Sequence, residues 1–235
     1  MNFDATEDQV SIRNAIQEIC NDFSDDYWLR KDREGGFPED FYSAIAKAGW
    51  LGIAMPVEYG GAGLGISEAC AMMETVSASG AGMSGASSIH MNVFGLHPVV
   101  MHGSDEQKKR WLPPIISGEA KACFGVTEPN TGLNTLKLKT MAVRKGDKYV
   151  VNGQKIWIST AQVAQKILLL ARTTPIEEVK SSTHGLSLFY TDLDRTKIEV
   201  REIEKLGRKC VDSNQLFIDG LEIPAWYYKV ACFGF

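Results

Sequence analysis

The sequence predicts an α+β protein in which an all-α half comes first and an antiparallel β half follows. Apolar residues recur at helical spacing up to about residue 120. After that point the chain carries short runs of branched and aromatic residues between turn-forming residues, a pattern typical of strands. The length of 235 residues, 44% of them hydrophobic, is enough to bury a sizeable core in one large domain or two smaller ones.

Helix starts are marked by two capping boxes, at residues 6–9 and 104–107. In each, Thr or Ser is followed three positions later by Gln, so that each side chain bonds the other residue's backbone N–H. The helix after the second box is expected to end before the two prolines at 113–114, because proline lacks the N–H that a helix interior requires. Further helices are expected from Pro38 to Gly49, after Ser67, and within the apolar segment 84–102.

In the second half, the dipeptide Asn152-Gly153 lies between the strand-like runs 149–151 and 155–158. Asn-Gly favours the two positive-φ positions of a type I′ turn, so these runs are expected to form a hairpin. Further strands are expected at 166–172, 185–191, 198–203 and 215–218.

The expected domains are residues 1–120 (α-helical), residues 121–224 (β) and a divergent tail at 225–235. The last ten residues are aromatic and apolar, with a single charge at Lys229. They either complete the β core or are not a native continuation of the domain.

Charge and composition exclude several classes of protein. The 25 basic residues are outnumbered by 29 acidic ones and form no block, so a dedicated nucleic-acid binder is not expected. The longest aliphatic run, 167–171, is far too short to span a membrane, and neither end carries a readable targeting signal. The five cysteines show no C-x-x-C spacing, so no metal site or disulfide framework is expected; free thiols in a soluble, intracellular protein are the simpler interpretation.

The glycine-rich segment 60–65 precedes a predicted helix and raises the hypothesis of a phosphate-binding loop in a nicotinamide-dependent dehydrogenase. The context argues against it. The residues before the loop contain Pro56 and follow a helical stretch, so no βαβ unit is available to present it. A tight connection between helices is the expectation, and a helical 50–80 region would eliminate the nicotinamide hypothesis.

A stronger candidate lies where two predicted strands end in polar residues. The run that includes Phe124 and Val126 ends at Thr127 and opens into a small polar loop, and Trp157 precedes Ser159 in a similar arrangement. An indole ring can stack on a planar heteroaromatic ligand while neighbouring hydroxyls donate to its acceptors. The alternative is that Thr127 and Ser159 are ordinary polar residues at strand ends.

Five sequence motifs, two of which contain the candidate residues, occur along the chain. They are Gly-Val-Thr-Glu-Pro at 125–129, Gly-Gln-Lys-Ile-Trp-Ile-Ser at 153–159, Glu-Tyr-Gly-Gly-Ala-Gly at 58–63, Glu-Gln-Lys with Trp-Leu-Pro at 106–113, and Lys-Leu-Gly-Arg at 205–208. In this order and spacing the chain resembles the acyl-CoA dehydrogenase family over about residues 5–224.

The resemblance implies an N-terminal α-helical domain, a β-barrel-like middle domain and FAD held non-covalently. The cofactor-binding residues that it implies are Phe124, Val126, Thr127, Gly132, Trp157, Ile158 and Ser159. Ser159 stands where many relatives have threonine, and its hydroxyl is expected near flavin N5. Leu133 stands where several relatives have a serine that contacts the CoA part of the substrate, a hydrogen bond that leucine cannot make.

The activity implied is α,β-dehydrogenation of an acyl-CoA, with an electron-transferring flavoprotein or oxygen as acceptor and a homo-oligomeric assembly. Relatives continue for about 150 residues as a C-terminal helical bundle, a unit of ordinary domain size, which carries the catalytic glutamate. That bundle is expected to be missing here, so no residue is assigned as the catalytic base. The alternative is a non-catalytic remnant that binds flavin weakly or binds only a protein partner. The compartment stays open among cytoplasm, mitochondrion and peroxisome.

Two groups of titratable residues receive a structural interpretation. Glu128 is a possible base, but the turn at Pro129 is its more natural place. The four histidines have no convergent partners in the sequence, so solvated or core positions are expected for them.

Overall fold

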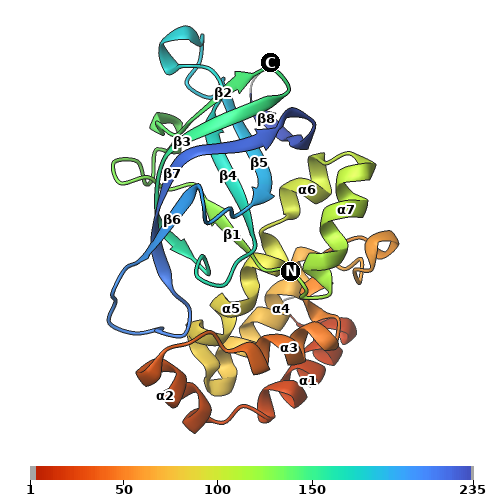
Figure 1. The fold of residues 1–235 in the computed structure, drawn as a ribbon. Helices are drawn as coiled ribbons and strands as arrows, with labels where there is room; N and C mark the ends of the chain where they lie inside the picture. Colours follow the sequence, from red (N-terminus) through yellow and green to blue (C-terminus); the bar gives the residue numbers. More distant parts are fainter. Residues whose placement is uncertain (1–3, 234–235) are drawn as a thin grey trace. The chain divides into compact units, whose positions relative to one another are not determined.

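The computed structural model describes residues 4–233 of the chain (Figure 1). These residues form two compact units. The helical unit consists of residues 4–94, 111–119 and 205–211, and the sheet unit consists of residues 95–110, 120–204 and 212–233. Among the described residues every α-helix starts before residue 120 and every strand after it, so the predicted α+β class is confirmed.

The helical unit is built on one apolar core. Its α-helices are α1 (Glu7–Asn21), α2 (Asp25–Glu34), α3 (Glu39–Lys47), α4 (Ile66–Val76), α5 (Gly82–Phe94) and the last part of α7 (Asp105–Ile116), with a π-helical turn at Ser77–Ala81 and 3₁₀ turns at Trp50–Gly52 and Val57–Tyr59. The core includes Ile16, Phe41, Ile45, Met72 and Ile89, all fully buried. The rings of Trp28 and Phe41 meet edge to face within it, with centroids 5.1 Å apart.

Local chemistry sets the helix starts as the sequence predicts. Thr6 Oγ1 accepts from Gln9 N at 3.2 Å, and Gln9 Oε1 accepts from Thr6 N at 3.3 Å. The same reciprocal pair forms between Ser104 and Gln107, so both capping boxes are confirmed. Helix α2 was not predicted, because its sequence is highly charged and buries only Trp28.

The prediction that the last helix ends before Pro113 and Pro114 is wrong. Helix α7 passes through both prolines and ends at Ile116. The prolines remove two backbone donors, but Leu112, Ile115 and Ile116 are buried, and the burial of these side chains offsets the lost bonds. The expectation of helix within the apolar segment 84–102 is confirmed. This segment divides into α5 and α6 (His97–His102).

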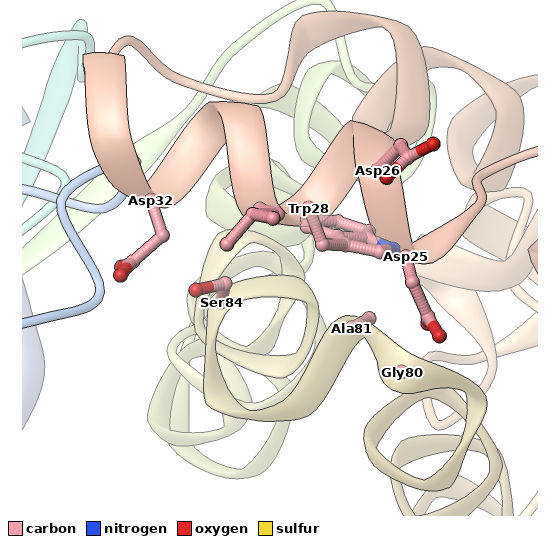
Figure 2. Close-up of a pocket in the computed structure, with 8 residues that line it drawn as sticks. Asp25, Asp26, Trp28, Asp32, Gly80, Ala81 and Ser84 are labelled. Carbon is pink, nitrogen blue, oxygen red and sulfur yellow. The ribbon is translucent and has the colours of Figure 1, made fainter.

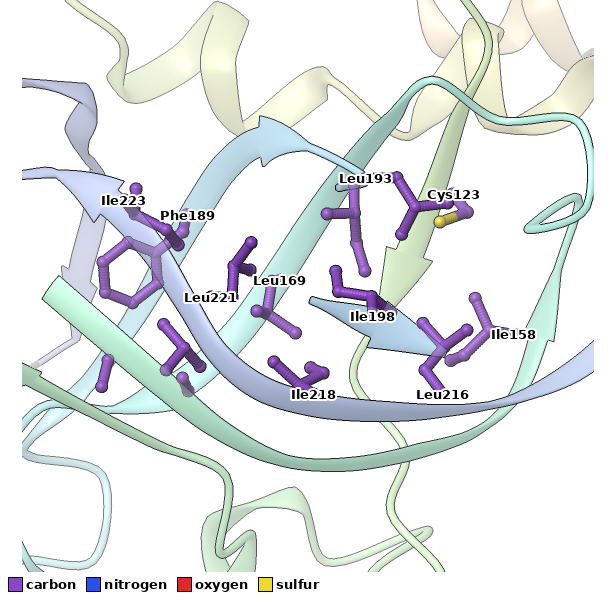
Figure 3. Close-up of a cluster of buried hydrophobic side chains, with 14 of the residues drawn as sticks. Cys123, Ile158, Leu169, Phe189, Leu193, Ile198, Leu216, Ile218, Leu221 and Ile223 are labelled. Atoms are coloured by element: carbon purple, nitrogen blue, oxygen red, sulfur yellow. The ribbon is translucent and has the colours of Figure 1, made fainter. Parts of the chain in front are cut away.

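The sheet unit is a curled, mostly antiparallel sheet. Its strands are β1 (Ala122–Gly125), β2 (Met141–Lys145), β3 (Lys148–Ser159), β4 (Lys166–Arg172), β5 (Leu186–Asp192), β6 (Ile198–Glu202), β7 (Ser213–Pro224) and β8 (Tyr228–Phe233). They follow the order β6-β7-β3-β2-β4-β5-β8, and β1 pairs in parallel with β4. The strands enclose a half-barrel core that includes Cys123, Ile158, Leu169, Phe189 and Leu216 (Figure 3). The four strands expected between residues 166 and 218 are confirmed as β4 to β7.

The predicted hairpin at Asn152-Gly153 is wrong, because β3 runs through both residues as one strand. The turn lies earlier, between β2 and β3, where Gly146 has a φ of 63°. Asn152-Gly153 instead forms an irregularity in the pairing of β3 with β7. Asn152 Oδ1 accepts from Gly220 N at 2.8 Å, and a Cβ on Gly153 would lie 2.7 Å from Thr140 Cα. Glycine is therefore required there for close approach of the chain, not for a turn.

The tail that the sequence sets apart extends the edge of the sheet. Strand β8 pairs with β5 in antiparallel fashion, and α6 contacts β8 within the same unit. Residues 225–233 thus take part in the fold of the sheet unit, while residues 234–235 lie outside the described residues. The domain limits at 120 and 224 stay predictions.

Replacing Gly153 with alanine tests this close approach. We expect Gly153→Ala to lower the free energy of unfolding by about 1–3 kcal/mol, since the new methyl group overlaps Thr140 and the backbone must shift. Urea denaturation measures the change. Gly132→Ala is the control, because a Cβ there meets nothing within 4 Å, and it should leave stability nearly unchanged. Equal losses in the two variants would contradict the assignment.

Candidate functional site

The first predicted segment follows the end of β1 and contains hydrogen-bond donors that have no acceptor in the described part of the chain. Strand β1 pairs with β4 up to Gly125 opposite Leu169, and Val126 and Thr127, both half-buried, follow the end of the strand. Among the described residues, neither the N–H nor the Oγ1 of Thr127 has a hydrogen-bond acceptor within the chain. Phe124 remains 40% exposed on the face opposite the core residue Cys123.

The second segment is a strained bulge near the end of β3. The pairing of β3 with β7 shifts between Lys155 and Ile158, and Trp157 within the shift has a φ of 63°. Positive φ is uncommon for a bulky residue and is found where a side chain is re-aimed at a functional site. The indole of Trp157 is 61% exposed, which is unusual for tryptophan. Ser159 follows, half-buried, with no described partner for its hydroxyl.

The structure brings these two segments together. Ile156 N donates to Thr127 O at 2.9 Å, which joins them through their main chains. Lys155 Nζ, a fully buried ammonium group, donates to Val126 O at 3.0 Å and to Glu128 Oε1 at 2.9 Å. Thr127 therefore lies next to the bulge that carries Trp157 and Ser159, as a shared site requires.

Glu128 is structural and not a free base. Its carboxylate accepts from Lys139 N at 2.6 Å and from Thr140 N at 2.9 Å, in addition to Lys155. Burial alone would raise its pKa, but the Lys155 charge and these donors outweigh burial and hold the pKa of Glu128 below its usual value. Burial lowers the pKa of Lys155, and the Glu128 charge opposes that effect. The expected turn is present as well, because Glu128 and Thr131 exchange two backbone hydrogen bonds of 3.0 Å.

A polar network fixes the bulge from the other side. Asn214, fully buried on β7, donates to Ile158 O at 2.8 Å and bonds Asp212, whose carboxylate also accepts from Gln162 N at 3.1 Å. Arg195 closes the following loop by donating to Ala161 O at 2.6 Å. This network leaves the 157–159 backbone little freedom to move.

The other predicted residues lie around these segments in different ways. Gly132 is exposed and Leu133 is fully exposed, so both are accessible to a ligand. Ile158 is 2% exposed and packs in the half-barrel core, so only its main chain could meet a cofactor. Beside Glu128, Asn130 and Thr131 line a pocket of about 230 Å³. The ligand-binding roles of all these residues stay predictions.

Three functional elements were missed from the sequence: Lys155, Asn214 and Arg195. A lysine directly before the apolar residues 156–158, in a run predicted to be a strand, is a signal that could have found the first, since a buried lysine needs a partner of opposite charge. No comparable local signal marks Asn214 or Arg195, because their partners lie far away in the sequence.

The glycine-rich segment 60–65 is a connection between helices, as predicted. It lies between a 3₁₀ turn and α4, and residues 50–80 contain no strand, which eliminates the nicotinamide hypothesis. The loop's backbone N–H groups are also used internally, because Ala62 donates to Gly52, Gly63 to Met55 and Leu64 to Ile53. They are therefore unavailable to cradle a phosphate.

A pocket of about 390 Å³ in the helical unit is lined by Asp25, Asp26, Asp32 and Trp28 (Figure 2). The acids have local explanations. Asp25 and Asp26 lie in the first turn of α2, where negative charge is favourable, and Asp32 accepts from Lys209 N at 3.2 Å. Among the side chains that the structure describes, residues 4–226, no group of three potential ligands could hold a metal ion.

The histidines show no catalytic arrangement either. His90 Nδ1 lies 2.9 Å from Ser87 O, and burial, together with the nearby Arg208 charge, lowers the pKa of His90. No helix in the described part of the chain has the length and hydropathy needed to cross a membrane.

In the chain, a helical unit is followed by a curled sheet. Two strand ends of this sheet carry hydrogen-bond donors without acceptors among the described residues, and an exposed indole lies at one of them. These features define a class of α+β proteins with two units. Family comparison identifies it further. The acyl-CoA dehydrogenase N-terminal domain matches residues 6–119, and the middle domain of the same family matches residues 123–221. The chain belongs to the acyl-CoA dehydrogenase family, which confirms the resemblance.

Individual relatives agree with this assignment. Acyl-CoA dehydrogenase FadE12 of Mycobacterium tuberculosis is 31% identical over 226 residues, covering 95% of this chain and 56% of the relative. Mitochondrial isovaleryl-CoA dehydrogenase of Pongo abelii is 28% identical, covering 94% of this chain and 52% of that protein. A structure of glutaryl-coenzyme A dehydrogenase in its glutaryl-CoA complex superposes with a TM-score of 0.89 at 26% identity, covering all of this chain and 58% of that one. The chain thus spans little more than half the length of the curated relatives it matches.

The Glu128–Lys155 pair predicts a specific dependence of stability on pH. A carboxyl whose pKa is lowered in the folded state contributes stability above its ordinary pKa of about 4.3, and that contribution is lost as the pH falls through the folded-state value. We expect Glu128→Gln to lower the free energy of unfolding by about 3–5 kcal/mol at pH 7, because the Lys155 charge is left buried without its partner. The difference from wild type should shrink below about pH 4.

Urea unfolding at a series of pH values measures this difference. Glu222→Gln is the control, since Glu222 pairs with Lys148 at 2.7 Å on the surface and its loss should matter little at any pH. A loss in Glu128→Gln that does not change between pH 7 and acid would count against the ion pair.

Thr160 offers a test of backbone strain beside the site. It has a φ of 67°, is β-branched, and its buried Oγ1 has no partner. We expect Thr160→Gly to raise the free energy of unfolding by about 1 kcal/mol, since relief of strain exceeds the entropy cost of glycine. Thr160→Ala, which removes the hydroxyl but keeps the strain, should gain less. Thermal unfolding compares the three proteins, and a stability loss in Thr160→Gly would refute the assignment.

Proposed function

We propose that this chain binds FAD and an acyl-CoA thioester as part of an acyl-CoA dehydrogenase that oxidises the α,β bond of the acyl group. One observation supports the proposal: Thr127, whose donors have no acceptor in the described chain, is joined through Ile156 N to the bulge that carries the exposed Trp157 and is followed by Ser159. A flavin has carbonyl and ring-nitrogen acceptors along its edge and an apolar plane, so it matches both features. Membership of the family supports the same cofactor.

The residues present have the donors and the apolar surface that such a group requires. Ser159 Oγ would donate near flavin N5, the N–H and Oγ1 of Thr127 would donate to other acceptors of the ring, and Trp157 would shield an edge from water. Phe124, Val126 and Gly132 would complete the contact, with Ile158 contributing main chain only. FAD, when bound, supplies the acceptor for the hydride that leaves the β-carbon.

Substrate contact at Leu133 is limited to apolar atoms. Its side chain is fully exposed and cannot donate a hydrogen bond to the CoA part of a substrate. The α-proton must go to a base, and Glu128 is excluded from that role by its three hydrogen bonds. We therefore assign the base to none of the described residues and expect the C-terminal helical bundle of the family to supply it.

The electron acceptor of the proposed reaction is an electron-transferring flavoprotein or oxygen. A structure described as the electron transferring flavoprotein of Acidaminococcus fermentans superposes with a TM-score of 0.86 at 28% identity, covering 97% of this chain and 59% of that one. This likeness describes the fold of the chain and does not choose between the two acceptors. Assembly into homo-oligomers is proposed on the family's pattern.

Titration of the purified chain with FAD tests the proposal. We expect visible flavin absorbance near one FAD per chain after desalting. Thr127→Val and Ser159→Ala should each raise the Kd for FAD up to about tenfold, because each removes one hydroxyl donor. Ser181→Ala is the control, since this exposed hydroxyl bonds only its loop neighbour Thr183 in the described structure.

The outcome also separates the alternative function. Bleaching of bound flavin by an acyl-CoA would support catalysis by the chain itself. A folded, colourless chain that takes up no FAD would overturn the proposal and favour a non-catalytic remnant that binds a protein partner.

A further inference from the structure

We infer that Lys155 is a positioning residue for the flavin site, which aims the backbone N–H of Thr127 at the cofactor. The inference deepens the proposed function and rests on it. It assigns a role to a fully buried ammonium group whose hydrogen bonds go to Val126 O and Glu128 Oε1.

The geometry of one peptide unit carries the inference. The peptide bond between Val126 and Thr127 is trans, so the C=O of Val126 and the N–H of Thr127, which share a peptide plane, point in opposite directions. Lys155 Nζ donates to Val126 O at 3.0 Å and so draws this carbonyl toward the buried side of the segment. The Thr127 N–H is thereby turned away from that side, and it has no acceptor within the described residues.

Neighbouring hydrogen bonds prevent this peptide unit from rotating. Thr127 O accepts from Ile156 N at 2.9 Å, and Glu128 N donates to Thr131 O at 3.0 Å. The next peptide unit is therefore fixed at both its ends.

Lys155 itself cannot turn away. Its Nζ is also held by Glu128 Oε1 at 2.9 Å, and that carboxylate is fixed by Lys139 N and Thr140 N. Because Lys155 precedes the bulge at Trp157 by two positions, the same side chain sets the spacing between the two segments that carry the donors.

The pair is costly to bury, which argues for a role beyond stability. Replacing a buried ion pair by apolar or neutral groups of similar size is often neutral for folding, whereas removing one partner is not. A double variant can therefore separate positioning from stability. Lys155→Met leaves Glu128 without its cation, while Lys155→Met/Glu128→Gln removes both charges and leaves the Val126 carbonyl without its donor.

The experiment measures the Kd for FAD and the melting temperature of wild type, Lys155→Met, the double variant and Ile223→Ala. Ile223 is a fully buried core residue on β7 that pairs with Tyr149, at the other end of β3 from the bulge, so its variant controls for lost stability. We expect Lys155→Met to bind FAD about tenfold more weakly. The double variant should regain most of the melting temperature but keep the weakened binding and an altered visible flavin spectrum. Ile223→Ala should retain wild-type affinity.

Two results would overturn the positioning role while the proposed function stands: recovery of FAD affinity together with stability in the double variant, or binding by Lys155→Met that equals binding by Ile223→Ala. If wild type itself binds no FAD, the proposed function fails and this inference fails with it. Amide hydrogen exchange at Ile156 gives a readout without cofactor: faster exchange in Lys155→Met supports the role, and unchanged exchange overturns it.

Discussion

The buried ion pair between Lys155 and Glu128 is the constraint on which the candidate site depends. Two side chains that ordinarily stay in water are 0% and 7% exposed here, and each is satisfied by more than its partner. Taking both charges out of water costs free energy that their attraction alone does not reliably return. What the pair provides is geometry, because it ties the loop after β1 to a strand that is 27 residues further along the chain.

Strand β3 serves this geometry through two irregularities. At Asn152-Gly153 the absence of a side chain on Gly153 lets Thr140 approach the strand closely. At Trp157 the strand bulges, and this residue has a positive φ. The first lets the strand pass the segment that holds Glu128, and the second turns an indole outward beside Thr127. The bulge at Trp157 thus lies where the proposed ligand would bind, while core-facing residues before the first irregularity, such as Val151, keep the half-barrel intact.

The sequence predicted what local interactions decide. Capping boxes, the positions of β4 to β7 and the role of the glycine-rich segment as a connection between helices all follow from neighbouring residues, and the structure confirms them. Contacts between distant residues decided the rest. Asn152-Gly153 indicates a turn until Thr140 is packed against it, and Pro113-Pro114 indicates a helix end until the burial of Ile115 and Ile116 is counted. For the pair Lys155–Glu128 the sequence offers one clue, the lysine directly before the apolar residues 156–158, but this clue does not identify the partner 27 residues away.

The helical unit is not one continuous piece of chain. Residues 205–211 belong to it, and two hydrogen bonds bind them there: Arg208 Nη1 to Ser87 Oγ at 2.8 Å, 121 residues apart, and Lys209 N to Asp32 Oδ1 at 3.2 Å, 177 residues apart. During synthesis, the ribosome must therefore make most of the sheet before the helices can acquire their last segment. The helical unit, most of which is synthesised first, is consequently completed only late in synthesis of the chain.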